Sequence, residues 1–162
     1  MTAIHKAAFR RDLATVEFLV NHGADLNIVD SQNSSALIYA LRPEAEGDAH
    51  AVASYLISAG CDVTIHSVGN VTPHYAAERG YLDVVLDILN AEGVELEVRD
   101  ANGYTPAFTA VHARNVFVME ALINAGADLA CVDAFGVPLI RHAIGANQPE
   151  MLGLLENNII AE

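Results

Sequence analysis

The 162-residue chain is poor in basic residues and contains no long apolar run. Its 8 Lys and Arg residues stand against 21 Asp and Glu residues, which gives a formal net charge of −13. Because nucleic acid is a polyanion, this balance argues against DNA or RNA as a partner. No apolar stretch approaches the ~18 residues of a membrane-spanning helix, and the first residues lack the apolar core of a secretory signal. We therefore expect no membrane insertion and a cytoplasmic or nuclear protein.

Cysteine is equally scarce, and tryptophan is absent. The two cysteines, Cys61 and Cys131, fall at different positions of the repeat described below, so nothing indicates a disulfide between them. A reducing compartment fits this usage best. We interpret both thiols as small buried side chains and not as redox centres or ligands.

The acidic charge is unevenly distributed along the chain. Lys6, Arg10 and Arg11 make the first stretch locally basic, whereas residues 83–100 hold six acids and only one arginine, Arg99. Two interpretations stay open for the acidic stretch. It is either a solvated face that keeps the protein soluble or a surface on which a basic partner docks.

Four glycines recur at nearly equal spacing, each between an apolar run and a short polar or acidic stretch. They are Gly23, Gly60, Gly93 and Gly126, separated by 37, 33 and 33 residues. Self-similarity at a period of ~33 residues is typical of a stacked array of repeats. Because such an array presents a long surface, its usual task is to hold another macromolecule.

Two further signals follow the same period and predict a pair of helices in each repeat. A Thr-Pro step such as Thr105-Pro106 marks a helix start, because the hydroxyl caps free amides and proline tolerates the first helical position. An apolar run such as Val116–Ile123 predicts the second helix, which the glycine ends. Pairs of small or apolar residues, which let two helices approach closely, stand at Ala7-Ala8, Ala40-Leu41, Ala76-Ala77, Ala110-Val111 and Ala143-Ile144.

The links between helix pairs carry a pattern of their own. Seven residues after each glycine comes a short polar residue, and three residues later comes a residue type that accepts a left-handed backbone at low cost. This chemistry predicts a tight turn that projects sideways from the helices. The paired positions are Asp30 and Asn33, Ser67 and Asn70, Asp100 and Gly103, and Asp133 and Gly136.

These motifs together resemble an ankyrin-repeat domain, whose repeats read D-x-x-G-x-T-P-L-H-x-A-A before a helix that ends in G-A-D. The most similar stretches are Asp100–Val111 and Thr2–Asn27. The resemblance implies an all-α solenoid of helix-turn-helix units with projecting β-turn loops. It also implies a partner bound on the concave side, which the loop tips and first helices form. Nearly the whole chain is covered as five units, at about 1–29, 30–66, 67–99, 100–132 and 133–162.

The chain departs from the family pattern at several points. Unit two carries four extra residues within Arg42–Asp48, where proline, glycine and acids predict an exposed, mobile loop. Unit three lacks the apolar residue expected after Pro73. Unit five lacks the closing glycine, because Ile159 stands at that position.

Seven histidines raise the question of a metal or catalytic site. The resemblance implies a structural role for His5 and His74, which occupy its T-P-x-H position and would bond loop backbone. The remaining histidines lack the close paired spacing of zinc ligands. No nucleophile stands in a recognisable arrangement with a base, and no glycine loop could hold a phosphate. We therefore expect no catalytic residues, no metal, no cofactor and no enzyme activity.

The expected partner-binding residues lie at the loop tips and at the ends of the first helices. Toward the C-terminus the tips change from polar to apolar and aromatic side chains, and buried aromatic residues dominate interface energetics. The alternative is that these side chains only stack on adjacent loops. We expect the surface to centre on Tyr81, Tyr104 and Phe135. The full set is Phe9, Arg10, Val68, Val71, Glu78, Arg79, Tyr81, Asn102, Tyr104, His112, Phe135 and Val137.

One asparagine has a second interpretation. Asn27 follows an Asp-Leu pair and resembles the site that the asparaginyl hydroxylase of hypoxia signalling modifies in ankyrin repeats. The same residue type in this position also serves to stabilise the link.

The sequence thus predicts a non-enzymatic protein–protein interaction module, a monomer or a fragment of a longer chain, that recruits or scaffolds another protein. Two alternatives remain open. The first is a stoichiometric inhibitor or regulatory domain of an enzyme such as a kinase. The second is the cytosolic ankyrin segment of a larger channel or signalling protein.

Overall fold

The computed structural model describes residues 1–42, 44–45, 47–67, 70–91 and 93–159, so Pro43 and Glu46 of the insertion and Val68 of the third link lie outside it. Within these residues the chain forms ten α-helices and one short hairpin. The helices are α1 (Ala3–Phe9), α2 (Leu13–Asn21), α3 (Ala36–Leu41), α4 (Ala49–Ser58), α5 (Thr72–Arg79), α6 (Leu82–Leu89), α7 (Pro106–His112), α8 (Val116–Asn124), α9 (Leu139–Gly145) and α10 (Pro149–Ile159), and the strands are β1 (His66–Ser67) and β2 (Asn70–Val71).

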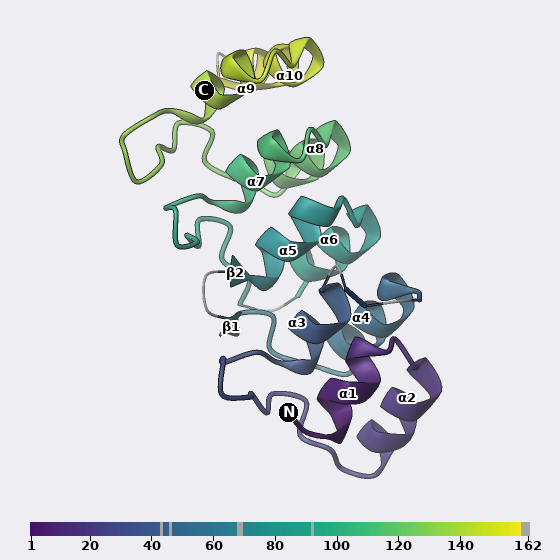
Figure 1. Ribbon diagram of the computed structural model, residues 1–162. Helices are drawn as coiled ribbons and strands as arrows, with labels where there is room; N and C mark the ends of the chain where they lie inside the picture. The colour runs from purple at the N-terminus through teal and green to yellow at the C-terminus, as the bar shows by residue number, and fades with distance from the viewer. Residues whose placement is uncertain (43, 46, 68–69, 92, 160–162) are drawn as a thin grey trace.

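The helices stack as five pairs into an elongated array (Figure 1). The first helices α1, α3, α5, α7 and α9 contact one another in order, and the second helices α2, α4, α6, α8 and α10 do the same in a parallel layer. The links project from the side of the first helices, and one helix pair falls within each of the five sequence ranges. The expected all-α ankyrin solenoid is therefore confirmed. In the described part of the chain, no helix has both the length and the apolar character to span a bilayer.

The core lies between neighbouring repeats, where small residues allow the helices to approach closely. Ala8, Ala40, Ala76 and Ala110 are fully buried at equivalent positions of their first helices. Every residue of α3 is buried because α1 and α5 cover it on opposite sides. Each repeat thus buries its apolar residues against its neighbours, as expected for a solenoid.

Glycine ends the second helices as predicted. Gly23, Gly60, Gly93 and Gly126 all have positive φ, with values of 81° at Gly23 and 90° at Gly126. This left-handed conformation costs glycine little because it has no Cβ atom. It turns the chain out of each helix and into the link.

The links of units two, four and five are built on an aspartate. In each, one carboxylate oxygen accepts two backbone N–H groups of the turn; in unit four, Asp100 Oδ1 accepts from Asn102 and Tyr104 at 2.8 Å each. The residue three positions later has positive φ, as at Gly103 with 76°. The equivalent bonds of the other two links are made by Asp30 and Asp133.

The third link differs from the predicted turn. Asn70 lies in β2 and pairs with Ser67 of β1, and His66 pairs with Val71. The expectation that Asn70 occupies a left-handed turn position is therefore wrong. A serine has no carboxylate that could accept two backbone N–H groups, and the third link is closed by strand pairing instead.

The insertion in unit two is held more firmly than the sequence predicts. Ala45 is buried with 6% of its surface exposed. The guanidinium of Arg11, from unit one, donates to three carbonyl oxygens in this region, those of Ala40, Arg42 and Gly47. The expectation of a wholly exposed loop is wrong at Ala45, because a side chain distant in sequence fastens the segment.

Candidate protein-interaction surface

A groove of about 400 Å³ opens between the fourth link and the first helices α5 and α7. Of the residues expected to contact a partner, Glu78, Asn102, Tyr104 and His112 line it together. The complete lining is Glu78, Asp100, Asn102, Tyr104, Thr109, His112 and Ala113. It faces the side from which the links project, which is the side expected to bind a partner. We call it the Glu78–His112 groove.

The backbone on one side of the groove is held from two directions. The amide of Asp100 donates to the carbonyl oxygen of Tyr104 at 2.9 Å. His74 of unit three donates to the same oxygen through Nε2 at 2.7 Å. His5 makes the equivalent bond to the carbonyl oxygen of Ile28 at 2.9 Å. The structural role expected for both histidines, bonding the loop backbone, is confirmed.

Tyr104 is a wall of the groove and not a projecting side chain. Its ring stacks on Phe108 with 5.3 Å between the ring centroids, and the ring of His112 meets it edge to face at 4.8 Å. His142 of unit five also meets it edge to face, at 5.7 Å. Tyr104 is therefore half-buried among neighbouring rings, which is the alternative arrangement that the sequence left open for the aromatic tips.

A chain of hydrogen bonds runs from this groove into unit five. His142 Nε2 donates to Asp133 Oδ2 at 3.1 Å, and Nδ1 of the same ring lies 3.0 Å from His112 Nε2. In the neutral form His142 then accepts at Nδ1 the proton that His112 carries on Nε2. Sequence reasoning missed the contribution of His142. Its signal was present, since His142 stands 33 positions after Thr109, which also faces the groove.

The protonation states of His112 and Asp133, which belong to this series of hydrogen bonds, depend on their surroundings. Partial burial lowers the pKa of His112, and the neighbouring His142 lowers it further, while the charges of Asp100 and Asp133 partly oppose that effect. The backbone N–H of Val137, joined by that of Phe135 and by His142, holds the pKa of Asp133 below its usual range despite some desolvation. At neutral pH Asp133 is thus charged and His112 is neutral.

The fifth link carries the most exposed large apolar side chain of the expected set. Phe135 is 85% exposed and Val137 is 37% exposed, because the carboxylate of Asp133 holds the turn from inside and leaves the tip in solvent. Val71, the expected contact residue of the third link, lies in β2.

The remaining expected residues lie apart from the groove or at its margin. Phe9 is half-buried and meets the ring of Tyr39 edge to face at 6.2 Å, while Arg10 is exposed. Arg79 lies 3.9 Å from the carboxylate of Glu78. Tyr81 is half-buried at the turn between α5 and α6, away from the loop tips.

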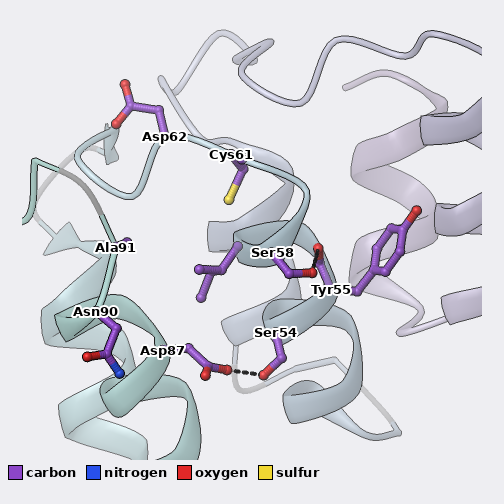
Figure 2. Close-up of a pocket in the computed structure, with 10 residues that line it drawn as sticks. Ser54, Tyr55, Ser58, Cys61, Asp62, Asp87, Asn90 and Ala91 are labelled. Carbon is purple, nitrogen blue, oxygen red and sulfur yellow. Dashed lines mark hydrogen bonds between the residues drawn. The ribbon is translucent and has the colours of Figure 1, made fainter.

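A second groove of about 840 Å³ lies between α4 and α6, on the layer of second helices (Figure 2). Polar and apolar side chains line it together, and Ser54 donates a hydrogen bond to Asp87 across it. Cys61 is buried at its margin, and burial raises the pKa of the thiol to about 12. This thiol therefore stays protonated and is a poor nucleophile. Cys131 is also buried, with its pKa raised mainly by burial.

Asn27 takes part in a contact between links. Its side-chain oxygen accepts the backbone N–H of Asp62, in the next link, at 2.8 Å. Glu97 makes the equivalent bond to the backbone N–H of Asp128 at 2.8 Å. The geometry at Asn27 is that of a link-stabilising residue. Among the described residues, no three or more His, Cys, Asp or Glu side chains converge as metal ligands would.

Comparison with known proteins finds ankyrin repeats along nearly the whole chain. The family model for ankyrin repeats (3 copies) matches residues 1–67 and 74–160. The chain is 30% identical over 141 residues to Neurogenic locus notch homolog protein 1 of Xenopus laevis, covering 86% of this chain and 5% of that protein. It is 33% identical over 125 residues to the Tyrosine-protein kinase Shark of Drosophila melanogaster, covering 76% and 13%.

An L-asparaginase of Dirofilaria immitis is 26% identical over 151 residues, covering 93% of this chain and 25% of that protein. The chain thus spans a quarter or less of the length of these three relatives.

Proposed function

This chain belongs to the ankyrin-repeat family, and we propose that it is a non-enzymatic module that binds another protein on its concave side. The contact surface comprises the Glu78–His112 groove and the exposed tip of the fifth link. The module recruits its partner or serves as its scaffold, as one segment of a cytoplasmic or nuclear protein.

The exposure of Phe135 is the observation that carries this proposal. A phenylalanine with 85% of its surface in solvent gains nothing from the fold that holds it. Such a ring contributes strongly to binding once a partner covers it, because aromatic side chains are enriched among interface hot spots. It lies on the link next to the one that lines the groove, so a single partner can contact both.

The chemistry of the described side chains supports a binding role over catalysis. Burial raises the pKa of the thiols of Cys61 and Cys131, so neither is a thiolate at neutral pH. The facing nitrogens of His112 and His142 bond to each other, and Asp133 takes the remaining nitrogen of His142. The enzyme names among the relatives belong to proteins of which this chain matches a quarter or less.

The proposal is tested by affinity capture from extract with the intact chain, a Phe135→Ala variant and a matched control. Phe117→Ala is the control, because Phe117 is 68% exposed on α8 in the layer of second helices. We expect specific partners to be lost with Phe135→Ala and kept with Phe117→Ala. Loss with Phe117→Ala alone would assign binding to the second helices and contradict the proposal.

A further inference from the structure

An arginine of the chain itself fills the space between loop tip and first helix in unit two. The guanidinium carbon of Arg42 lies 4.2 Å from the centroid of the Tyr39 ring. Its Nη2 lies 3.1 Å from Ser34 Oγ and 3.5 Å from Gln32 Oε1. The Tyr39 hydroxyl donates to Asp30 Oδ2 at 2.6 Å and completes the arrangement. Unit two therefore contains an internal guanidinium site made of an aromatic ring, a loop-tip amide oxygen and a serine hydroxyl, and the carboxylate of Asp30 bonds the hydroxyl of that ring.

In unit four, the position equivalent to Arg42 does not hold an arginine. Seventy positions later, Asp100 and Asn102 replace Asp30 and Gln32, while His112 stands in the place of Arg42. Thr109 stands in the place of Tyr39 and is much smaller, so the Glu78–His112 groove of about 400 Å³ remains. Tyr104 now supplies the aromatic ring from the link.

We infer that the Glu78–His112 groove binds the guanidinium of an arginine that the partner protein supplies. This inference rests on the proposed function and names the chemistry of its partner. The incoming group lies against the ring of Tyr104, as Arg42 lies against Tyr39 in unit two. It donates to the carboxylates of Asp100 and Glu78 and to the amide oxygen of Asn102. That oxygen is left to accept because Asn102 Nδ2 already donates to Asp100 Oδ2 at 3.3 Å.

The charges around the groove favour a cation. Glu78 and Asp100 line it. Asp133 is connected to it by hydrogen bonds, because His142 bonds both Asp133 and His112 of the lining. Arg79 lies 3.9 Å from Glu78 in an exposed pair and offsets little of that charge. Arg99 adjoins Asp100 in the sequence, and its Nη1 donates to the carbonyl oxygens of Gly103 and Val132. An anionic group would meet like charges here, and the whole chain carries a net charge of −13.

Arginine fits better than lysine for a geometric reason. A guanidinium is planar, so it stacks on an aromatic ring while its edge donates several hydrogen bonds to separate acceptors. An ammonium group is a compact point charge without a face to stack. The acceptors of the groove come from α5 and from the fourth link, and a forked donor can reach both.

The groove is also sensitive to pH. His112 is neutral at neutral pH and becomes positive when it is protonated. As pH falls through the pKa of His112, which is lowered mainly by burial, the groove gains positive charge beside Asp100 and Glu78. His142, on α9, and Asp133, before it, face His112 from unit five through the hydrogen bonds that join them. Affinity for a guanidinium therefore falls as pH falls.

The experiment is an NMR titration of the full chain with N-acetyl-arginine methylamide as the probe. N-acetyl-citrulline methylamide, neutral and of the same shape, is the control ligand, and the lysine analogue is the second. We expect saturable shifts of the amide signals of Asn102, Tyr104 and His112 with arginine. With lysine the affinity should be weaker by roughly fivefold, and with citrulline no saturation should occur. Equal shifts with arginine and citrulline, or shifts spread over all acidic residues, would overturn the inference.

A variant that reproduces unit two gives the sharper test. The double change Thr109→Tyr with His112→Arg places the ring and guanidinium of unit two in unit four, and it should abolish probe binding. Glu78→Gln should weaken probe binding by roughly tenfold. Glu120→Gln makes the same change on α8, outside the groove, and is the matched control that should leave probe binding unchanged. Full binding by the double variant, with helix content intact by circular dichroism, would contradict the inference.

The outcomes keep this inference separate from the proposed function. If the captured partner depends on Phe135 but the probe does not bind the groove, only the arginine inference fails. If the probe binds while no partner depends on Phe135, the proposed docking of a partner at that link fails.

Discussion

Arg11 of unit one reaches Tyr81 of unit three across the whole of unit two. Its Nη2 lies 3.4 Å from the Tyr81 hydroxyl, and the two residues are 70 positions apart in the sequence. The same guanidinium donates to three carbonyl oxygens of unit two. Arg11 itself lies in the turn after α1 and has a positive φ of 51°. In a solenoid most contacts join nearest neighbours, whereas this side chain makes a direct contact between units one and three.

The first prediction concerns this coupling. Arg11→Ala removes the guanidinium donor from three carbonyl oxygens, of which that of Arg42 keeps the backbone N–H of Ala45, and should lower the free energy of unfolding by ~1–3 kcal/mol. Limited proteolysis should then cut the segment 42–48 faster. Arg10→Ala is the matched control, because it removes the same charge from an exposed neighbour. Equal sensitivity of the two variants would show that Arg11 does not hold the insertion.

The second prediction concerns the two facing imidazoles. Burial is the larger cause that lowers the pKa of His112, and the neighbouring His142 lowers it further. Protonation of His112 is therefore less favourable in the folded state than in the unfolded state. The stabilising contribution of neutral His112 is fully present above its unfolded pKa of 6.5 and is lost as pH falls through the folded value. An NMR titration should find the His112 pKa below 6.5, and His142→Gln should raise it.

Urea unfolding between pH 7.5 and pH 5 supplies the second readout. The free energy of unfolding should fall less with pH in His112→Asn than in the parent chain, because the titrating group has been removed. A His112 pKa above 6.5 would contradict the hydrogen-bond arrangement described here.

The third prediction distinguishes Tyr104 from Phe135, because the sequence predicts both as partner contacts. Tyr104→Ala removes a half-buried ring that packs on Phe108 and His112, so it should lower the free energy of unfolding by ~1–3 kcal/mol. Phe135→Ala removes an exposed ring and should leave the unfolding midpoint nearly unchanged while weakening partner binding by ~1–3 kcal/mol. Chemical unfolding and a binding isotherm on each variant measure both effects. A large loss of stability in Phe135→Ala would mean that this ring packs on the fold.

The fourth prediction compares two glycines with the same left-handed backbone. A Cβ atom on Gly103 would lie 2.7 Å from the Ala134 nitrogen, which belongs to the neighbouring link, whereas nothing lies within 4 Å of one on Gly126. Gly126→Ala therefore carries only backbone strain, ~1 kcal/mol. Gly103→Ala adds a clash with backbone, and we expect ~2–4 kcal/mol.

Hydrogen exchange locates the damage from these glycine changes. In Gly103→Ala the amides of units four and five should exchange faster while those of unit one keep their protection, because contacts between repeats are local. Uniform loosening along the chain would argue against a modular array.

The sequence by itself determined the parts of this protein that depend on local chemistry. The spacing of Gly60, Gly93 and Gly126 predicted the repeats, because only a residue without Cβ ends these helices in a left-handed conformation cheaply. Asp100 and Gly103 predicted a tight turn for the same kind of reason, since a carboxylate can bond the amides two and four residues onward. Each of these signals lies within a few residues of the helix end or turn that it predicts.

The tertiary structure decided which distant side chains meet. Ala45 is buried because Arg11 holds its segment, and Tyr104 became a wall of the groove because His142 of the next unit packs against its edge. The third link pairs as strands, although Asn70 suits a turn in isolation. Each of these outcomes depends on contacts between units, and no local pattern contains them. The position of Phe135 was predictable from the register, but its exposure depends on the turn that Asp133 holds from the inside.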